Sequence, residues 1–495
     1  MTHHNRSNEA LNPELDPKRW LILTVIAIAQ LMVVLDASVV NIALPTAQKA
    51  LHISNVDRQW VVTAYSLTFG GFLLLGGRLS DFIGRKRIFI IGLIGFAMSS
   101  ALGGSSVDGG MLFGARALQG IFGALMTPAA LSMLSLTFTE EKERATAFGI
   151  YGAIAGGGAA VGLLLGGILT EYLGWNWCLY INAPIGIITV LVAIPLLKES
   201  VADGDRRYDL FGAVTATAGL ALLVYAFTEA AQDGWTASVT IGLLITATVL
   251  LTAFVIRELR TSHPLLPMRV LLERNRGGSF LASFLAGAGL FSMFLFLTYY
   301  FQESLGYSSL KTGVAFLPFS VGIILSAGLA SQLLPRFGPR PLMVIGFIMT
   351  GIGSLYLTTI GVGANFFTTV FPSECLMSIG LGLVFVPLTA TSLLNVSGHD
   401  SGVASALVNT TQQVGGALGT ALLNTVFTSA VAAFLVLHGK GKSALINAPI
   451  HGYKVVFVYS TVTFFIAMVV VAILVTAKKI ESKKEPQAEL ALSGV

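Results

Sequence analysis

The segment GRLSDFIGRKR, residues 77–87, lies between two long apolar runs of the chain. It places Asp81 close to Arg85 and Lys86, with glycines at positions 77 and 84. The flanking runs, 60–77 and 88–104, approach the length of about 20 residues that a helix needs to cross a bilayer. The sequence therefore predicts two transmembrane helices joined by a short charged turn.

Similar apolar runs fill most of the remaining chain. Of 495 residues, 54% are hydrophobic and 11% are charged, whereas about a quarter are charged in soluble proteins. The mean hydropathy of +0.78 excludes an ordinary soluble domain, because its polar groups could not cover the surface. We predict fourteen spans, at 20–44, 60–77, 88–104, 111–136, 145–169, 177–197, 210–227, 239–256, 280–301, 313–334, 342–359, 366–391, 403–435 and 455–476.

Basic residues are divided unequally between the two sets of loops that these spans define. One set, together with both tails, holds most of the 30 lysines and arginines, and the other holds Lys49, Arg58, Lys311, Lys440, Lys442 and Lys454. The positive-inside rule then places both termini in the cytoplasm. Because the charge follows the loops, the net charge of +5 indicates membrane orientation, and we expect no nucleic-acid partner.

A weak internal repeat supports two related halves. The segment SQLLPRFGPRP, residues 331–341, aligns with residues 77–87 when Gly338 is set over Gly84. Leu333 then matches Leu79, and Arg340 matches Lys86. The offset is about half the chain, which fits two six-helix bundles with two further helices between them.

The segment at 77–87 resembles the cytoplasmic signature of the major facilitator superfamily, G-x-L-x-D-x-x-G-R-K. Other segments are similar to its fourteen-helix drug:proton antiporter branch: LDASVVNIALP (35–45), QWVVTAYSL (59–67), RALQGIFGAL (116–125), GGGAAVGLLLGG (156–167), LGYSSLKTGVAFLP (305–318) and NTTQQVGGALG (409–419). The resemblance covers nearly the whole chain. It implies an all-α integral membrane protein of the major facilitator fold, with two six-helix bundles, two inserted helices and cytoplasmic termini.

The implied organisation has five parts: a cytoplasmic tail at 1–19, an N-terminal bundle at 20–200, two inserted helices at 201–262, a C-terminal bundle at 263–477 and a second cytoplasmic tail at 478–495. The fifth span carries a helix-packing motif at Gly158, Gly162, Gly166 and Gly167. Antiporters usually have a proline within this motif, where this chain has Leu163 or Leu164. We expect close packing to persist without the kink.

Three ionisable residues lie within predicted spans. At 1.5 Å per residue, Asp36 lies roughly 24 Å along the first span and Arg116 roughly 8 Å into the fourth, at similar depths from the outer face. Glu374 lies roughly 12 Å into the twelfth span. Because a charge inside the bilayer is costly, we interpret all three as proton-coupling or substrate-binding residues. The alternatives are structural acids and an arginine that reaches the outer interface.

Other polar and aromatic residues are candidates for lining a substrate cavity: Asn41, Gln119, Tyr299, Tyr300, Asn409 and Gln413. Contacts between helices and an aromatic belt are the alternative explanations. The resemblance further implies a conformational latch at Gly77, Asp81, Gly84, Arg85 and Lys86, which holds the two halves together in one state. A solvated turn that serves only orientation is the alternative.

We predict a proton-coupled efflux antiporter of the multidrug or antibiotic-resistance type in the inner (plasma) membrane, exporting small amphipathic or cationic compounds by alternating access. The alternatives are a proton-coupled uptake symporter and a membrane-embedded enzyme, for which no nucleophile or acid pair is evident. We expect no metal and no cofactor, since the sequence has no metal-ligand spacing and no phosphate loop. The partners are a small-molecule substrate, protons and the lipid bilayer. The oligomeric state stays open, and we expect a monomer to suffice.

Overall fold

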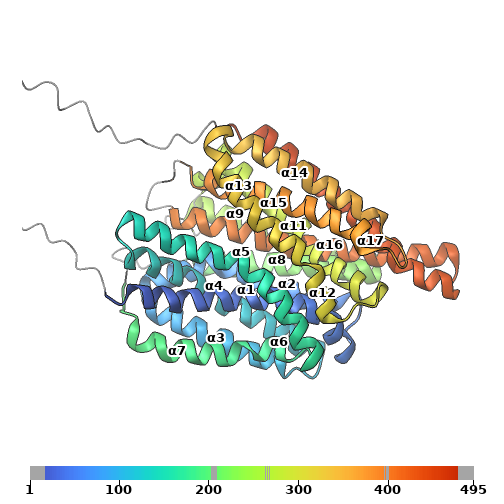
Figure 1. The fold of residues 1–495 in the computed structure, drawn as a ribbon, viewed down its shortest axis with the longest axis horizontal. Helices are drawn as coiled ribbons and strands as arrows, with labels where there is room; N and C mark the ends of the chain where they lie inside the picture. Colours follow the sequence, from blue (N-terminus) through green and yellow to red (C-terminus); the bar gives the residue numbers. More distant parts are fainter. Residues whose placement is uncertain are drawn as a thin grey trace, which may run out of the picture.

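The computed structural model describes residues 17–201, 209–261, 264, 266, 268–394, 396 and 401–477. The predicted tails at 1–19 and 478–495 therefore lie outside the described residues, apart from residues 17–19. Regular structure in the described part is entirely helical (Figure 1). This confirms the predicted all-α fold class.

The helices follow one another in two groups separated by an inserted pair. The N-terminal group is α1 (Arg19–Ala50), η1 (Asp57–Gln59), α2 (Trp60–Ile83), α3 (Arg85–Gly104), α4 (Gly109–Thr137), α5 (Glu141–Tyr172), α6 (Trp177–Tyr180) and α7 (Asn182–Leu196). The inserted pair is α8 (Leu210–Asp233) and α9 (Ser238–Arg260). The C-terminal group is α10 (Met268–Leu271), α11 (Arg274–Tyr299), η2 (Tyr300–Ser304), α12 (Ser309–Ala315), α13 (Leu317–Phe337), α14 (Pro339–Tyr356), η3 (Leu357–Thr359), η4 (Phe366–Val370), α15 (Phe371–Ser392), α16 (Ser401–His438) and α17 (Lys442–Leu474).

Thirteen helical segments of the described chain are long and apolar enough to cross a membrane. The predicted fifth span corresponds to α5, whose described apolar stretch is Gly158–Tyr172. Two predicted spans are interrupted. The sixth divides into α6 and α7 at Ile181, and the tenth into α12 and α13 at Phe316. Pro318 follows the second break, where a ring without an N–H is tolerated in the first turn of a helix.

Helix packing repeats between the two groups. In the first group α2 and α3 both pack on α4, α1 packs on α5, and α3 packs on α7. In the second group α13 and α14 both pack on α15, α11 packs on α16, and α14 packs on α17. The aligned glycines, Gly84 and Gly338, each join two helices with positive φ, at 120° and 77°. The sequence repeat thus reflects two bundles of the same architecture.

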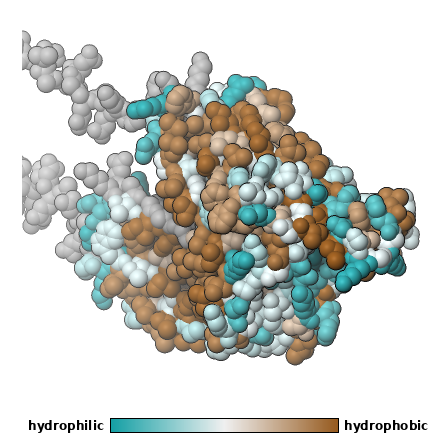
Figure 2. All heavy atoms as spheres, turned by 45° about the vertical axis from the view of Figure 1, so that its right-hand side comes forward, coloured by the Kyte–Doolittle hydropathy of each residue, from teal (hydrophilic) through white to brown (hydrophobic). Residues whose placement is uncertain are grey.

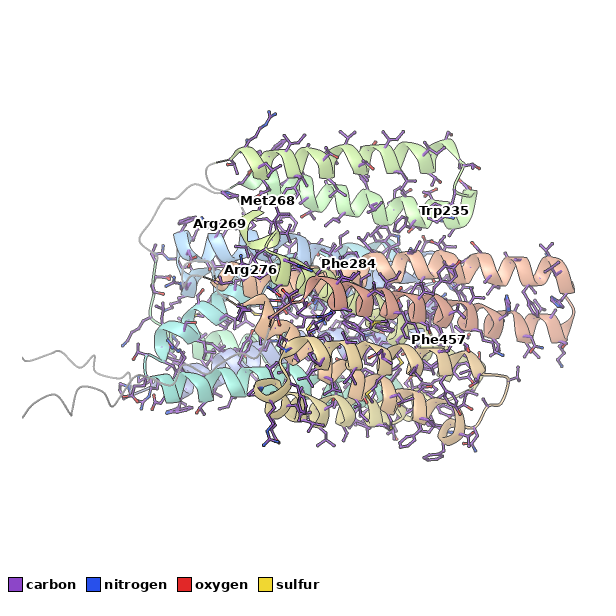
Figure 3. All side chains as sticks on the ribbon, turned by 90° about the horizontal axis from the view of Figure 1, so that it is seen from above. Trp235, Met268, Arg269, Arg276, Phe284 and Phe457 are labelled. Atoms are coloured by element: carbon purple, nitrogen blue, oxygen red, sulfur yellow. The ribbon has the colours of Figure 1, made fainter. Side chains whose placement is uncertain are left out.

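The inserted pair lies along one side of the molecule (Figure 3). Its helix α8 contacts both bundles. Gln59 of η1 donates a hydrogen bond to the Thr228 hydroxyl at 2.7 Å, and Thr425 of α16 donates one to the Phe227 carbonyl at 2.7 Å. The inserted pair therefore covers the seam between α2 and α16.

Apolar side chains cover much of the molecular surface (Figure 2). Large exposed examples include Leu191 on α7, Val249 on α9 and Leu325 on α13, with 66%, 60% and 69% of their surface exposed. Such a surface is stable only where lipid replaces water as the solvent. The chain is therefore a multi-pass membrane protein.

Both ends of the described chain lie at the same end of the molecule (Figure 1). At that end Arg19 of α1 donates two hydrogen bonds of 2.8 Å to Glu143 of α5. These bonds lower the pKa of Glu143 below its usual value. The pair ties together the starts of α1 and α5.

The assignment of that end to the cytoplasm is a prediction, which cysteine labelling can check. A cysteine at Ser200 should react with an impermeant maleimide only in inside-out vesicles, and one at exposed Ser443 only in intact cells. The background should carry serine at Cys178 and Cys375, the first buried and the second half-buried. Labelling of position 200 in intact cells would contradict the predicted topology.

Candidate functional site

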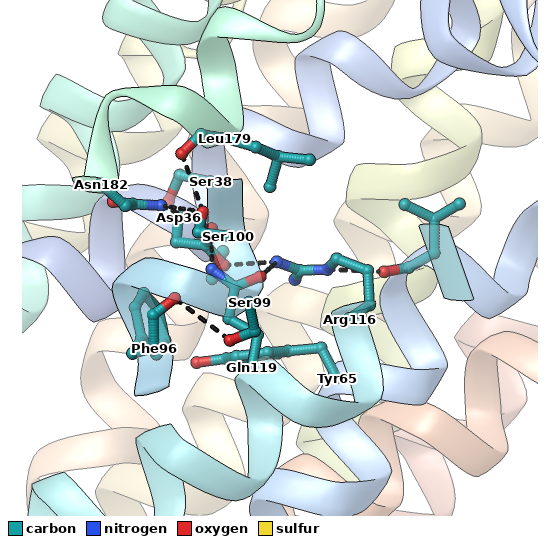
Figure 4. Close-up of polar contacts among 12 residues, drawn as sticks. Asp36, Ser38, Tyr65, Phe96, Ser99, Ser100, Arg116, Gln119, Leu179 and Asn182 are labelled. Atoms are coloured by element: carbon teal, nitrogen blue, oxygen red, sulfur yellow. Dashed lines mark hydrogen bonds and ion pairs between the residues drawn. The ribbon is translucent and has the colours of Figure 1, made fainter. Parts of the chain in front are cut away.

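Asp36, Arg116 and Gln119 meet in the interior of the N-terminal bundle (Figure 4). Arg116 and Gln119 are three residues apart on α4 and therefore share one face of that helix, which they turn toward Asp36 on α1. The Arg116 Nη1 donates to Asp36 Oδ2 at 2.6 Å and to Gln119 Oε1 at 2.6 Å. Gln119 Nε2 completes the triangle by donating to Asp36 Oδ1 at 2.7 Å.

A third element, α7, contributes Asn182 to this network. Its Nδ2 donates to Asp36 Oδ1 at 2.9 Å and to the Ser100 hydroxyl at 2.9 Å. Arg116 is held from other sides by the Val61 carbonyl, 3.0 Å from its Nε, and by the Tyr65 ring, 4.5 Å from its guanidinium carbon. Five helices, α1, α2, α3, α4 and α7, and both charges are thus joined in one polar cluster.

The Asp36–Arg116 pair is sealed from solvent in this conformation. The side chains are 0% and 2% exposed. Burying either charge alone would be costly, and each is compensated by the other and by the surrounding amide groups. Removing one member of such a pair leaves an uncompensated charge, so the cluster strongly couples the positions of α1 and α4.

The predicted glycine motif of α5 lies against the segment of α1 that carries Asp36. A Cβ at Gly162 would lie 2.6 Å from Ser38 Cβ, and one at Gly166 would lie 2.9 Å from Val39 Cα. Gly158 faces Val34 in the same way. Gly167 instead faces the C-terminal bundle, where a Cβ would lie 2.7 Å from Leu310 Cα. The motif therefore allows backbone contact on two sides, and α5 is continuous without the proline of related motifs.

Glu374 lies on α15 in the C-terminal bundle, apart from the Asp36 cluster. The residue is fully buried, and neither carboxylate oxygen has a hydrogen-bond partner among the described residues. A charged carboxylate without a partner is costly at such a position. Asp36 and Glu374 are thus buried acids in contrasting environments, the first paired with Arg116 and the second without a partner among the described residues.

A cavity of about 750 Å³ lies between the two bundles, near the C-terminal end of α1. Its walls include Gln48, Lys49, Arg58, Tyr299, Phe427 and Tyr453, from α1, η1, α11, α16 and α17. The volume falls within the range of about 300–1,000 Å³ typical of small-molecule pockets. Aromatic rings combined with charged groups make this cavity suited to amphipathic compounds.

The family model of the Major Facilitator Superfamily matches residues 26–420. The chain belongs to this superfamily. Among related transporters, the puromycin resistance protein of Streptomyces alboniger is 47% identical over 94% of this chain and 92% of its own. The cephamycin export protein of Amycolatopsis lactamdurans is 37% identical over 80% of this chain and 83% of its own. The tetracenomycin C resistance and export protein of Streptomyces glaucescens is 32% identical over 87% of this chain and 80% of its own.

Solved structures share the fold of this facilitator at low sequence identity. A bacterial homologue of the human lysosomal transporter Spinster, in an inward-facing and occupied conformation, superposes with a TM-score of 0.65. The match is 16% identical and covers 92% of this chain and 96% of the other. Together with the family match, it confirms the predicted transporter fold.

The remaining predicted cavity residues of this facilitator are dispersed. Tyr299 alone among the predicted residues contributes to the described cavity, and its hydroxyl contacts Gln48. Tyr300 is buried and donates to the Gly361 carbonyl at 2.9 Å. Asn41 donates to Ala37 of its own helix, Asn409 is exposed, and Gln413 packs against Gly70. In this conformation these residues do not form one binding surface.

The signature at 77–87 forms a compact turn at the end of the molecule where the chain begins. Arg85 pairs with Asp81 at 2.9 Å, and Gly84 between them has a φ of 120°, which favours glycine. Glu199 accepts the Lys86 and Arg87 amides at 3.1 and 3.2 Å. Within the described part of the chain, the polar contacts of Asp81, Arg85 and Lys86 stay inside the N-terminal bundle. The predicted bridge between halves is thus not present in this conformation.

Sequence reasoning missed two members of the polar clusters. Asn182 lies within the predicted sixth span, and the argument that selected Asn41 applies equally to it. Arg58 was assigned to an outer loop because it precedes the second span, yet only 2% of the residue is exposed. A basic residue directly beside an apolar run can point into the protein, and the hydropathy of the run does not show whether its side chain points inward or outward.

Proposed function

We propose that this facilitator exports small amphipathic or cationic compounds in exchange for protons, by alternating access of its two bundles. The buried Asp36–Arg116–Gln119–Asn182 cluster carries the proposal. Export is further supported by relatives whose names describe antibiotic resistance or export. The boundaries proposed for the moving units are 20–200 and 263–477, with 201–262 as the inserted pair.

Coupling follows from the chemistry of the cluster. Protonation of Asp36 removes its negative charge and leaves Arg116 as an uncompensated buried cation. That state is unstable in the closed conformation, so proton binding favours a conformation in which water or other groups reach Arg116. A proton and a cationic substrate can then alternate at the same acid, which is the requirement for antiport.

Transport by reconstituted or membrane-embedded protein tests the proposal. Everted vesicles with an acidic interior should accumulate ethidium, and accumulation should collapse when a protonophore removes the pH gradient. Right-side-out vesicles distinguish the alternative, because an uptake symporter would accumulate the compound in that orientation. If accumulation does not depend on the proton gradient, proton coupling is refuted, but the proposal that the protein transports the compound still stands.

We propose Glu374 as a second protonatable site that contacts substrate cations when the C-terminal bundle opens to water. Glu374→Gln should reduce export of cationic compounds about tenfold more than export of neutral ones, because glutamine keeps the shape but never carries a charge. Initial export rates for matched cationic and neutral dyes would measure this. Glu374→Asp, which retains the acid, is the control. An equal loss for both dyes would assign Glu374 to proton coupling or structure.

We further propose that the Asp81 turn acts as a conformational latch. Asp81→Asn removes the ion pair with Arg85, and we expect transport to fall about tenfold while substrate binding changes less than threefold. Asp209, which pairs with Arg257 outside the signature, supplies a matched Asp→Asn control. If Asp81→Asn transports at the parent rate, the signature serves only orientation.

A further inference from the structure

Arg58 joins the N-terminal bundle to the C-terminal bundle through contacts that are mostly aromatic. Its guanidinium carbon lies 4.0 Å from the ring centre of Tyr299, 4.8 Å from that of Phe427 and 5.7 Å from that of Phe296. These three rings are called the aromatic box. Arg58 Nε also donates to Asn424 Oδ1 at 3.3 Å. Every one of these partners belongs to α11 or α16, whereas Arg58 belongs to η1.

The charge of Arg58 is held without an acid. No described carboxylate forms an ion pair with it, and its Nη2 has no hydrogen-bond partner within the described chain. The nearby Glu303 pairs instead with Lys49 at 2.7 Å. A buried guanidinium in this state depends on the π faces around it, since no opposite charge compensates its lost hydration.

The aromatic box is built within one bundle. The ring centres of Phe296 and Phe427 lie 5.4 Å apart, and the Phe427 ring stacks on that of Tyr453 of α17 with 5.0 Å between ring centres. None of these ring–ring contacts involves the N-terminal bundle, whose α1 contacts the box through Gln48 and the Tyr299 hydroxyl. When the bundles separate at this end, the box therefore moves as a unit with the C-terminal bundle, and Arg58 leaves with the other.

The vacated box would open on the cavity described above, because Tyr299, Phe427, Tyr453 and Arg58 all line it. Aromatic faces without a cation attract organic cations, with quaternary and guanidinium groups as favoured ligands. A compound of drug size fits the adjoining volume of about 750 Å³. The site that Arg58 fills in the closed state thus becomes available in the open state.

We propose that the aromatic box binds the cationic group of an exported compound, and that Arg58 competes for the same faces and displaces it when this end closes. This rests on the proposed export function and assigns its release site. Two cations cannot share one set of ring faces, so return of Arg58 favours release of the compound before the bundles meet. Return of Arg58 therefore lowers the affinity for the compound as this end closes, while proton exchange drives export.

Equilibrium binding of tetraphenylphosphonium to the purified full chain, measured by calorimetry without any proton gradient, tests the competition. Arg58→Gln should tighten binding by roughly threefold to thirtyfold, the range expected for one cation–π contact. Adding Phe427→Leu should reverse most of that gain. Phe294→Leu is the matched control on α11, because its ring contacts Phe316 and Phe319 outside the box.

Neutral triphenylphosphine oxide separates competition from a simple increase in access. Its affinity should change less than twofold in Arg58→Gln. Equal tightening for both compounds, or no change for the cation, would overturn the proposal and reduce Arg58 to a structural seal. Because no gradient is applied, a positive binding result stands even if export in vesicles fails, so the two proposals fail separately.

Discussion

Replacing Asp36 by asparagine is expected to abolish uphill export. Asparagine preserves the size of the side chain but cannot carry the proton that antiport requires. When its Oδ1 accepts from the Gln119 and Asn182 amides, as Asp36 Oδ1 does in the parent, its Nδ2 faces the Arg116 guanidinium, which is also a donor. We expect accumulation of ethidium in everted vesicles to fall to the level of empty membranes, together with loss of substrate-induced proton release.

The same substitution should destabilise the protein, which calls for a matched variant. Arg116 would remain as a buried cation without its acid, at a cost of up to about 3–5 kcal/mol. The double variant Asp36→Asn/Arg116→Gln removes both charges and should recover much of the thermal stability in detergent. Uphill export should stay absent in the double variant. If it exports against a gradient, Asp36 is not the coupling site and Glu374 becomes the leading candidate.

The fold was largely predictable because the membrane imposes simple rules. Apolar length and the charge of the loops gave the order of the spans, and each predicted span has a helix in the structure. Helix ends were less predictable, since α1 continues to Ala50 and α16 reaches His438, beyond the predicted limits of 44 and 435. The apolar part of a helix is about as long as the hydrocarbon core is thick. A helix that continues into water keeps its backbone hydrogen bonds there, but its residues are polar, so hydropathy does not show where it ends.

The candidate site was predictable in part. The sequence placed Asp36 and Arg116 at similar depths, which permits a contact, and in the structure they form a direct ion pair. The depth of a residue along its helix does not show which way its side chain points around the helix axis. Asn182 and Arg58 turn inward, whereas Asn409 is exposed. Contacts between bundles also depend on the conformational state, which a sequence does not specify.

Gly167 on α5 and Gly313 on α12 each allow the backbone of the opposite bundle to approach closely. A Cβ at Gly167 on α5 would lie 2.7 Å from Leu310 Cα and 2.9 Å from the Ser309 carbonyl oxygen. A Cβ at Gly313 on α12 would lie 2.4 Å from the Leu163 carbonyl oxygen. All of these neighbours are backbone atoms, which cannot move aside as the tip of a side chain can. Any larger residue at either position is therefore incompatible with the closed interface.

Gly167→Leu and Gly313→Leu should each hold this end of the transporter open and reduce export at least tenfold. A cysteine at Ser309, 8% exposed beside Gly167, should then react with an impermeant maleimide in intact cells, although it is protected in the parent. Gly242→Leu on α9 and Gly328→Leu on α13 are matched controls, because no atom lies within 4 Å of a Cβ at either position. These controls should express and export like the parent. If both test variants export like the parent and a cysteine at position 309 stays protected, the transport cycle does not require the close α5–α12 contact. The two bundles could then close through contacts elsewhere.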